Sequence, residues 1–438
     1  MYQLLNSLQK KEALDNHIKV GLVGCGQMGS GMINLTYQMP GLRIKAVADL
    51  AVERGIKAFE EVGYGRDQIV VTEKIKEAED ALSKDKAIVT PDALLLTRIE
   101  GLEALVEATG FPEVGAQVAY YGILGGKHIV MLNVETDVTV GWLLKRMADR
   151  SGIIYTVSAG DEPGAVMELY RFAKTLGFKV VCIGKGKNNP VNFFATPDDV
   201  REEALRKGMN PKMLCAFVDG TKTMVEMAEV SNATGALPDV PGMHGLKVDV
   251  PELSKKYIPK KDGGVFEHDF VVDYSTGKVA PGVFVVFTTD SPHLRQDLKF
   301  YSMGDGPYYT LYRPYHLCSF ETPISVARAC LLGEPTINSS KFNSEVIAVA
   351  KRDLEPGEII DGIGGFRIFG KIYPFEEAHK LDALPIGLAA GAKLTRRISQ
   401  GDILTYQDVE LDRGSFVVKL REMQDMAMFK EIGWENNG

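Results

Sequence analysis

The sequence of 438 residues predicts an α/β fold that begins with a parallel sheet and ends in a β-rich segment. Two observations support this prediction. Apolar runs alternate with helical patterns through the N-terminal half, as in proteins whose parallel strands are joined by helices. Towards the C-terminus the pattern changes to short apolar runs between glycine and proline turns. Because a chain of this length exceeds one ordinary core, we predict three domains, over residues 1–160, 161–340 and 341–438.

The first strand–helix–strand unit contains a glycine-rich turn. An apolar run over residues 18–23 enters the turn, a helical pattern follows it, and a second apolar run ends at Asp49. The turn consists of Gly24, Cys25, Gly26, Gln27, Met28 and Gly29. In this motif the glycines allow a tight bend, the approach of a pyrophosphate and close helix packing, and an acid about twenty residues further on binds a ribose. We therefore predict a Rossmann-type domain that binds NAD or NADP, the alternative being a glycine turn without a ligand.

Two charged residues bear on the choice between these cofactors. Asp49 favours NAD, because a carboxylate at this place can bind the ribose hydroxyls. Arg54, in the helical pattern that follows, can instead neutralise the additional phosphate of NADP. The sequence leaves both cofactors open.

The remaining elements follow from the hydrophobic periodicity. Helices are predicted at residues 1–17, 52–62, 114–124, 140–150, 164–176 and 322–332, and in a tail over residues 421–434. Strands are predicted within residues 104–110, 128–133, 153–157 and 179–183. Residues 67–97 are interpreted as an insertion with a short strand and two helices. Apolar runs after residue 265, joined by glycine and polar turns, are typical of an antiparallel sheet.

Polar residues follow two of the predicted parallel strands. One strand is followed by Thr109 and Gly110, and the next by Asn133 and Glu135. Ligands of open parallel sheets bind beyond the carboxyl ends of the strands. We therefore expect Thr109, Gly110 and Asn133 near a nicotinamide and Glu135 near a substrate. A helix cap or a turn is the alternative role for Asn133 and Glu135.

Three later segments carry candidate substrate-binding or catalytic residues. Lys185 and Lys187 follow a strand and can bind an anion, although an ordinary solvated turn has the same pattern. Arg313 can bind a carboxylate or phosphate, and His316 can transfer a proton, a structural histidine being the alternative. The candidates are Lys185, Lys187, Arg313 and His316.

A helix predicted within residues 212–235 carries several candidate catalytic residues. Asp219, Lys222 and Glu226 are spaced so that they share one helix face. We predict Lys222 as the proton donor, Asp219 as its partner and Glu226 as a second acid. Asn232 is a further substrate-binding candidate near the helix end. A plain solvated helix also carries such charge pairs.

Composition excludes several classes of function. The net charge of −8 and the absence of a basic block argue against a nucleic-acid partner. Apolar runs are too short to cross a membrane, and the N-terminus lacks the apolar core of a signal peptide, so we expect a cytoplasmic protein. Five widely separated cysteines favour neither a disulfide framework nor a zinc site.

With these motifs in view, the chain resembles the homoserine dehydrogenase-like oxidoreductases that carry a C-terminal SAF domain. The resemblance extends over nearly the whole chain. The motifs that carry it are the glycine turn, Asn133-Val-Glu135, Gly160-Asp-Glu-Pro163, Gly184-Lys-Gly-Lys187, Asp219-Gly-Thr-Lys-Thr223, Asn232-Ala-Thr-Gly235, Arg313-Pro-Tyr-His-Leu317 and Asp353-Leu-Glu-Pro-Gly-Glu358.

One branch of this group is the deoxyxylulose phosphate reductoisomerase-like enzymes. The resemblance implies a reductoisomerase or dehydrogenase that acts on a small anionic sugar-like carbonyl, such as 1-deoxy-D-xylulose 5-phosphate, with NADP or NAD. It also implies a divalent metal, Mg or Mn, for which Glu162, Asp219 and Glu226 are the candidate ligands. A homoserine-type or sugar-acid dehydrogenase, and a non-catalytic NAD(P)-binding regulator, are the alternatives. By analogy of fold we expect a homo-oligomer.

Overall fold

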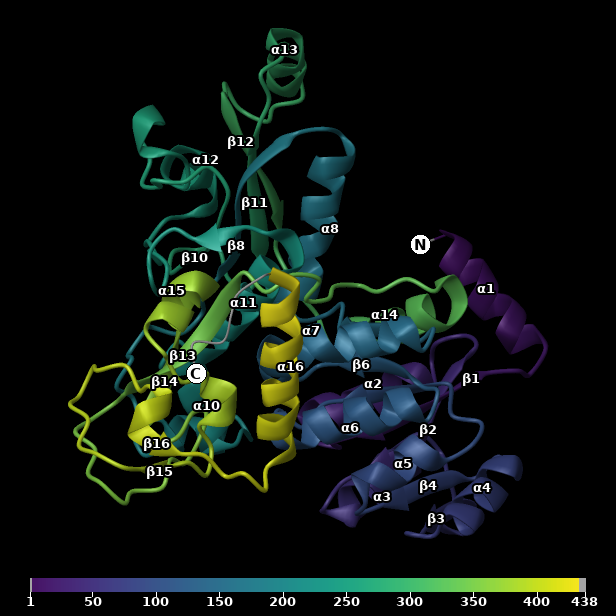
Figure 1. Ribbon diagram of the computed structural model, residues 1–438. Coiled ribbons are helices and arrows are strands. Elements are labelled where there is room, and N and C mark those ends of the chain that lie inside the picture. Colours follow the sequence, from purple (N-terminus) through teal and green to yellow (C-terminus); the bar gives the residue numbers. More distant parts are fainter. Residues whose placement is uncertain (1, 433–438) are drawn as a thin grey trace. The chain divides into compact units, whose positions relative to one another are not determined.

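The computed structural model describes residues 2–432 (Figure 1). These residues form two compact units, each built from separate stretches of the chain. Within the described residues, the first unit comprises residues 2–161, 317–338 and 415–432, and the second comprises Glu162–His316 and Ser339–Gly414. The units therefore differ from the three predicted ranges, because distant C-terminal stretches pack with each of them.

The first unit contains a seven-stranded sheet in the order β3-β4-β2-β1-β5-β6-β7. Its strands are β1 Ile18–Val23, β2 Leu42–Ala48, β3 Ile69–Val71, β4 Ala87–Thr90, β5 Ala104–Glu107, β6 His128–Met131 and β7 Tyr155–Val157. All six neighbouring pairs are parallel. Most strand residues are buried on both faces, as expected for a parallel sheet covered by helices. The predicted α/β fold is thus confirmed.

Nine α-helices belong to the described part of this unit. They are α1 Tyr2–Ala13, α2 Gln27–Thr36, α3 Val52–Glu61, α4 Ile75–Ser83, α5 Ala93–Arg98, α6 Pro112–Leu124, α7 Val134–Arg150, α14 Cys318–Leu332 and α16 Phe416–Ile432. Helix α14 packs on α2, and α16 packs on α6 and α7. Glu113 accepts hydrogen bonds from the N–H groups of Phe416 and Val417, which fixes the start of α16. The predicted tail helix therefore begins earlier than expected, and its last residues, 433 and 434, lie outside the described residues.

The interpretation of residues 67–97 as an insertion was wrong. Residues 87–90 form β4, which pairs with both β2 and β3, so this stretch extends the main sheet. The run Ala87-Ile-Val-Thr90 is short and follows a charged helix, and such a run can be assigned to a strand only through its neighbours.

The second unit contains a five-stranded mixed sheet in the order β12-β11-β8-β10-β9. Its strands are β8 Lys179–Gly186, β9 Leu237–Pro238, β10 Val271–Ser275, β11 Val283–Thr288 and β12 Tyr308–Arg313. Strand β10 pairs parallel to β8 and β9, whereas β11 pairs antiparallel to β8 and β12. The predicted antiparallel sheet is therefore correct only for part of this sheet.

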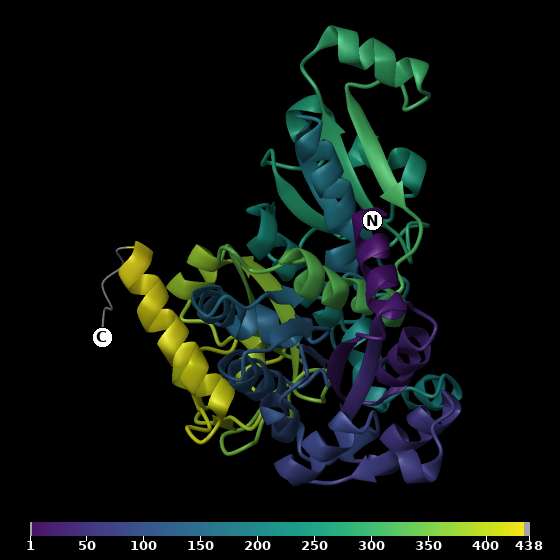
Figure 2. The same ribbon diagram turned by 90° about the vertical axis from the view of Figure 1, so that its right-hand side faces the viewer.

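Helices pack beside this sheet and join its strands. They are α8 Glu162–Thr175, α9 Arg201–Arg206, α10 Pro211–Val218, α11 Thr221–Thr234, α12 Leu253–Lys256 and α13 Pro292–Phe300. Helix α8 packs on β8, β11 and α11. Helix α13 lies beyond one end of the β11–β12 pair in both ribbon views (Figure 1, Figure 2).

Residues 339–414 supply the C-terminal stretch of the second unit. Their elements are β13 Ser344–Ala350, β14 Ile368–Pro374, α15 Phe375–Lys380, β15 Lys393–Leu394 and β16 Val409–Glu410. Short 3-10 helices occur in this stretch at Ile386–Leu388 and Tyr406–Asp408, and elsewhere in the chain at Arg66–Gln68, Val250–Glu252 and Lys260–Asp262. Strands β13 and β14 pair antiparallel and pack on α11.

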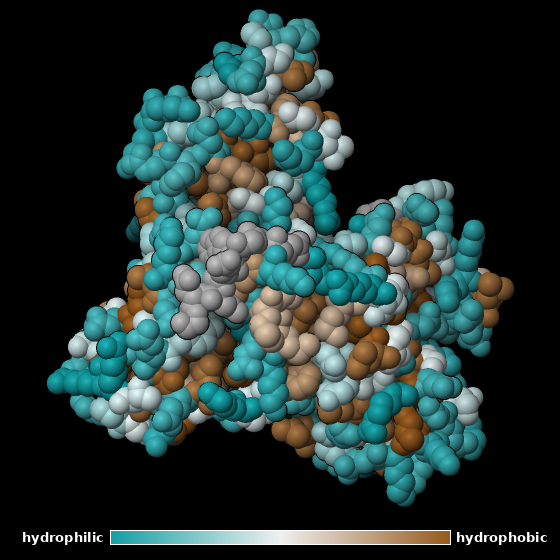
Figure 3. All heavy atoms as spheres, in the orientation of Figure 1, coloured by the Kyte–Doolittle hydropathy of each residue, from teal (hydrophilic) through white to brown (hydrophobic). Residues whose placement is uncertain are grey.

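The surface shown in Figure 3 is largely hydrophilic, with apolar residues between the charged ones. Among residues 2–432, none of the helices combines the length and the apolar character that crossing a bilayer would require.

A histidine between two carboxylates fixes the loop before β10. His244 Nδ1 lies 3.0 Å from Asp273 Oδ2, and His244 Nε2 lies 3.4 Å from Asp239 Oδ2. The hydrogen bond to the buried Asp273 raises the pKa of His244 against the effect of burial. A raised pKa in the folded state means that the protonated form stabilises the fold, and that this contribution is lost as pH rises through the folded pKa.

We therefore predict that His244→Gln lowers the free energy of unfolding by about 1 kcal/mol at acidic pH and by less at alkaline pH. Urea unfolding at about pH 5.5 and pH 8.5 measures both values. His293→Gln is the matched control, because His293 is exposed on α13 and pairs only loosely with Asp297. An equal loss at both pH values would contradict the prediction.

Candidate functional site

The glycine turn between β1 and α2 has the geometry of a pyrophosphate site. Gly24 adopts a φ of +94°, and a Cβ on Gly29 would lie 2.2 Å from the carbonyl oxygen of Gly24. A Cβ on Gly26 would meet no heavy atom within 4 Å in the described part of the chain. Helix α2 begins at Gln27 without a side-chain cap. The space beside Gly26 and the N–H groups of the first helical turn can therefore receive a phosphate.

Asp49, at the end of β2, lies directly beside this turn. Its Oδ2 accepts a hydrogen bond from Cys25 N at 2.8 Å, and its Oδ1 accepts one from Ala51 N at 2.8 Å. The Arg54 guanidinium, which is mostly exposed, lies 3.9 Å from Oδ1. Asp49 is thus held beside the glycine turn, while Arg54 remains mostly exposed. The burial of Cys25 raises the pKa of its thiol to about 12, consistent with a neutral filler.

The polar residues after β5 and β6 interact with one another. Thr109 N donates to Glu107 Oε1 at 2.9 Å, and Gly110 adopts a φ of +74°. Asn133 is the N-cap of α7, with its Nδ2 donating to Phe111 O at 3.1 Å. The cap role that the sequence allows for Asn133 is therefore observed, and this cap fixes the loop that begins with Thr109.

Two acids accompany these residues at the end of the sheet. Glu135 lies in the first turn of α7 and is buried, so the predicted substrate ligand is part of the helix that Asn133 caps. Glu107 is fully buried, and desolvation raises its pKa to about 7. The sequence prediction missed Glu107. Its only signal was an acid at the end of an otherwise apolar strand.

The second unit brings together charged residues from three elements. Lys185 on β8 lies with its Nζ 2.6 Å from Glu162 Oε1, at the start of α8, and in hydrogen-bond contact with Glu226 on α11. Lys222 Nζ lies 4.0 Å from the other oxygen of Glu226, and His316 Nε2 lies 3.6 Å from Glu162 Oε2. We call these five residues the Lys185 cluster.

The centre of the cluster is shielded from water. The side chains of Lys185 and Glu226 are 7% and 2% exposed. Burial by itself would lower the pKa of Lys185, but the carboxylates of Glu162 and Glu226 outweigh it and hold the pKa above its usual value. Lys185 is therefore a permanent cation between two acids. It is part of β8 rather than of a turn after it, because β8 extends to Gly186.

Lys187 follows the strand and has a different character. Its Nζ donates a hydrogen bond to the carbonyl oxygen of Phe217. Burial, followed by repulsion from Lys185, lowers the pKa of Lys187 to about 8. An ammonium group with a pKa near physiological pH is suited to proton transfer as well as to binding an anion.

The prediction that Asp219 is the partner of Lys222 was wrong. The stretch predicted as one helix contains two, α10 and α11, separated by Gly220 with a φ of +84°. Asp219 lies before this break, so it does not share a helix face with Lys222 and Glu226. Its carboxylate pairs instead with Lys351 at 2.7 Å.

Two other candidates have structural partners. Both polar atoms of the Asn232 side chain bond the backbone, Oδ1 accepting from Asn343 N and Ser344 N and Nδ2 donating to Ser344 O. Arg313 lies 3.3 Å from Glu168 and over the ring of Tyr315. The structure thus brings His316 to the Lys185 cluster and engages Asn232 and Arg313 elsewhere.

The proposed metal ligands fit a divalent ion only in part. Glu162 and Glu226 approach one cation, the Lys185 ammonium, and two carboxylates are suitable ligands for Mg²⁺ or Mn²⁺. An ion bound by the same two oxygens, Glu162 Oε1 and Glu226 Oε2, would compete with the Lys185 ammonium. Asp219 is paired with Lys351 and is not a member of this group.

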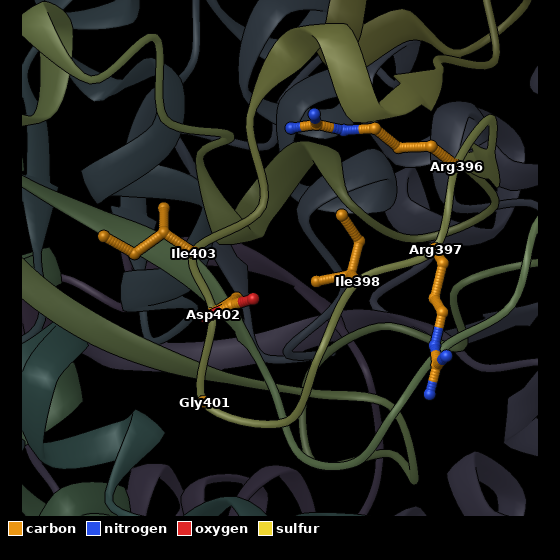
Figure 4. Close-up of a pocket in the computed structure, with 6 residues that line it drawn as sticks. All are labelled: Arg396, Arg397, Ile398, Gly401, Asp402 and Ile403. Carbon is orange, nitrogen blue, oxygen red and sulfur yellow. The ribbon is translucent and has the colours of Figure 1, made fainter.

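A shallow pocket of 440 Å³ lies in the C-terminal segment (Figure 4). It is lined by Arg396, Arg397, Ile398, Gly401, Asp402 and Ile403. The charges of its arginines are engaged by Asp408 and Asp353. Its lining residues are distinct from the Lys185 cluster, which we regard as the candidate site because two lysines, two acids and a histidine lie together there.

Comparisons with known proteins agree with an oxidoreductase. Residues 160–322 match the family model described as "Oxidoreductase DRL, catalytic domain". This range includes every residue of the Lys185 cluster. No match was found among the curated proteins.

Several solved structures are similar at low identity. A probable dehydrogenase from Thermotoga maritima is 11% identical, with 74% of this chain and 91% of that chain covered and a TM-score of 0.44. A scyllo-inositol dehydrogenase from Lactobacillus casei with bound NAD(H) is 13% identical, with 68% and 76% covered and a TM-score of 0.37. A 3-ketoreductase from Actinomadura kijaniata in complex with NADP is 13% identical, with 73% and 91% covered and a TM-score of 0.38. Identities this low transfer no site residue to this chain.

Proposed function

We propose that this chain, an NAD(P)-dependent oxidoreductase by its dinucleotide turn and its oxidoreductase catalytic domain, acts on a small anionic carbonyl compound or the corresponding alcohol. The observation that carries the proposal is the Lys185 cluster, a group of two lysines, two acids and a histidine in the matched range, with Lys185 and Glu226 buried at its centre. Such a group can bind an anion and exchange a proton in one place.

When bound, the nicotinamide supplies or accepts a hydride at the carbon of the substrate carbonyl. The residues of the chain bind the substrate and transfer the proton. Lys222 donates a proton to the carbonyl oxygen during reduction and removes it during oxidation, and Glu226 orients its ammonium group. Lys187 and Lys185 attract the anionic end, and His316 with Glu162 lies at the edge of the cluster. The buried surroundings strengthen each of these interactions.

The resemblance to homoserine dehydrogenase-like and reductoisomerase-like enzymes suggests particular substrates to test. We include 1-deoxy-D-xylulose 5-phosphate, aspartate semialdehyde, and four- and five-carbon sugar acids. If a reductoisomerase reaction occurs, Glu162 and Glu226 are the residues that would hold Mg²⁺ or Mn²⁺. A homo-oligomer and a SAF-type C-terminal segment remain part of this proposal.

The test is NAD(P)H oxidation with this substrate panel, for the wild type and for Lys222→Ala. Loss of the proton donor is expected to lower kcat by about 10²–10⁴-fold while cofactor binding is retained. Lys261→Ala is the control, because Lys261 is an exposed lysine of the same unit. Equal turnover by Lys222→Ala and wild type would refute the role of Lys222. Cofactor binding without turnover of any panel member would instead favour the non-catalytic regulator.

The pKa of Lys187, at about 8, predicts a pH dependence of substrate binding. Lys187 is protonated below this value, so the affinity for an anionic substrate is expected to fall as pH rises through about 8. The measurement is the KM of the anionic substrate between about pH 6.5 and pH 9.5, a range that brackets this pKa. Lys187→Met should raise KM at low pH and remove the dependence. A wild-type KM that is constant across this range would contradict the prediction.

A further inference from the structure

A buried ion pair connects the C-terminal β-rich segment to the start of α11. Lys351, which follows β13, lies with its Nζ 2.7 Å from Asp219 Oδ2, and the two side chains are 1% and 0% exposed. Lys351 also donates to the carbonyl oxygen of Gly365 at 2.7 Å. The other carboxylate oxygen of Asp219 accepts a hydrogen bond from Thr221 N at 2.9 Å. The pair therefore acts directly on the first residue of α11.

A second contact from the same segment reaches the same helical turn. The N–H of Gly370, on β14, donates to Thr221 Oγ1 at 2.8 Å. Lys222, the next residue, belongs to the Lys185 cluster. Two independent polar contacts thus fix the backbone on which Lys222 is placed.

The far end of α11 is fixed by the same segment. Ser231 Oγ lies 2.6 Å from Ser344 Oγ, and Asn232 Oδ1 accepts hydrogen bonds from Asn343 N at 2.7 Å and Ser344 N at 2.9 Å. Residues 339–414 contribute no member of the Lys185 cluster, yet they bond both ends of the helix that carries Lys222 and Glu226.

We propose that Lys351 is a positioning residue, which acts through Asp219 to orient α11 so that Lys222 and Glu226 meet Lys185. This inference rests on the proposed function of the Lys185 cluster. A buried ion pair is an expensive way to gain stability, because both charges must be desolvated, and apolar residues of similar size often serve as well. Its directional contacts instead select one orientation of the helix. The β-rich segment is therefore a support for the site rather than a separate binding module.

The experiment compares the reaction of Lys222 with pyridoxal phosphate and with pyridoxal. Both are aldehydes that form an imine with a neutral lysine amine, releasing water, and borohydride reduces that imine to a stable amine. Only pyridoxal phosphate carries an anionic group that the cluster can bind. The ratio of the two labelling rates at Lys222, obtained by peptide mass spectrometry, therefore reports the arrangement of the cluster without a known substrate.

The double variant Asp219→Asn with Lys351→Met removes both charges and leaves neither unpaired. We expect it to reduce the ratio about tenfold, since a small misplacement of reacting groups has effects of this order or greater. The double variant Arg396→Gln with Asp408→Asn is the control. Like the first double variant, the control removes one basic residue and one buried acid. Both of its residues lie in residues 339–414, and Asp408 bonds Arg396 and Thr405, which lie outside α11. The control should retain the wild-type ratio.

Thr221→Val and Thr221→Ser test the inference with all charges in place. The valine variant loses the hydroxyl that accepts from Gly370 N and should reduce the ratio, whereas the serine variant should restore it. If the role of these contacts were only structural, the variants would have a lower unfolding midpoint but the same ratio of labelling rates at Lys222. That result, for the Asp219→Asn, Lys351→Met variant or for Thr221→Val, overturns the inference. No preference for pyridoxal phosphate at Lys222 in the wild type would instead overturn the proposed function itself.

Discussion

Replacing Lys185 by methionine is expected to lower the free energy of unfolding by about 3–5 kcal/mol near neutral pH. The reason is the position of its ammonium between Glu162 and Glu226, whose side chains are largely buried. Methionine fills much of the same volume but leaves the two carboxylates close together without the cation that lies between them, and Lys222 Nζ lies 4.0 Å from the far oxygen of Glu226. Urea unfolding of the variant and the wild type measures the difference.

The pH dependence distinguishes this cause from a simple packing defect. Without Lys185, the adjacent carboxyls favour their neutral forms, so their pKa values in the folded variant rise above the unfolded values. The deficit should therefore shrink as pH falls and be smallest below about 4, where both carboxyls are protonated in the folded variant and in the unfolded chain. Adding Glu226→Gln should recover part of the lost stability at neutral pH. A deficit that is independent of pH and unaffected by Glu226→Gln would indicate lost packing only.

Two alanine substitutions in the glycine turn are expected to have different effects. A methyl group on Gly26 has space in the protein but occupies the place where a pyrophosphate approaches. We expect Gly26→Ala to retain the wild-type unfolding midpoint and to weaken NADH and NADPH binding roughly 30–100-fold, which corresponds to about 2–3 kcal/mol of lost contacts. Cofactor fluorescence measures the affinity, and thermal unfolding measures the fold.

The same change at Gly29 should affect both measurements. Its Cβ would lie 2.2 Å from a backbone oxygen of Gly24, which cannot rotate away as a side chain can. Gly29→Ala is therefore expected to destabilise the first unit by about 1–3 kcal/mol and also to lose cofactor affinity. If Gly26→Ala bound the cofactor normally, the turn would not be the pyrophosphate site. If Gly29→Ala were as stable as Gly26→Ala, the packing role of this glycine would be refuted.

The parts of the candidate site that depend on local spacing could be predicted from the sequence. Asp49 follows the glycine turn at a fixed distance because a strand, a turn, a helix and a second strand have regular lengths. Lys222 and Glu226 are four residues apart on a helix, and the structure retains that relation. The predicted pairing of Asp219 with Lys222 failed because one helix ends before Gly220 and the next begins after it. In the sequence, this single glycine looks like a residue within one helix.

The parts of the candidate site that depend on long-range pairing could not be predicted from the sequence. Glu162 and His316 join Lys185 only because α8, β8 and the end of β12 fold together. The short strand β4 was recognisable only from its two parallel neighbours. Lys351 carries no sequence signal at all, since a lysine after a short apolar run is normally a solvated residue.

The sequence by itself thus determined the parallel α/β unit, the dinucleotide turn and the residue types available for proton transfer. Tertiary structure decided which of those residues meet and which are engaged elsewhere. The physical reason is that periodicity reports the burial of a face within one element, whereas the partner of a buried charge is selected by desolvation. A buried ammonium or carboxylate must find an opposite charge wherever the fold supplies one, as Lys185 does with Glu162 and Asp219 does with Lys351.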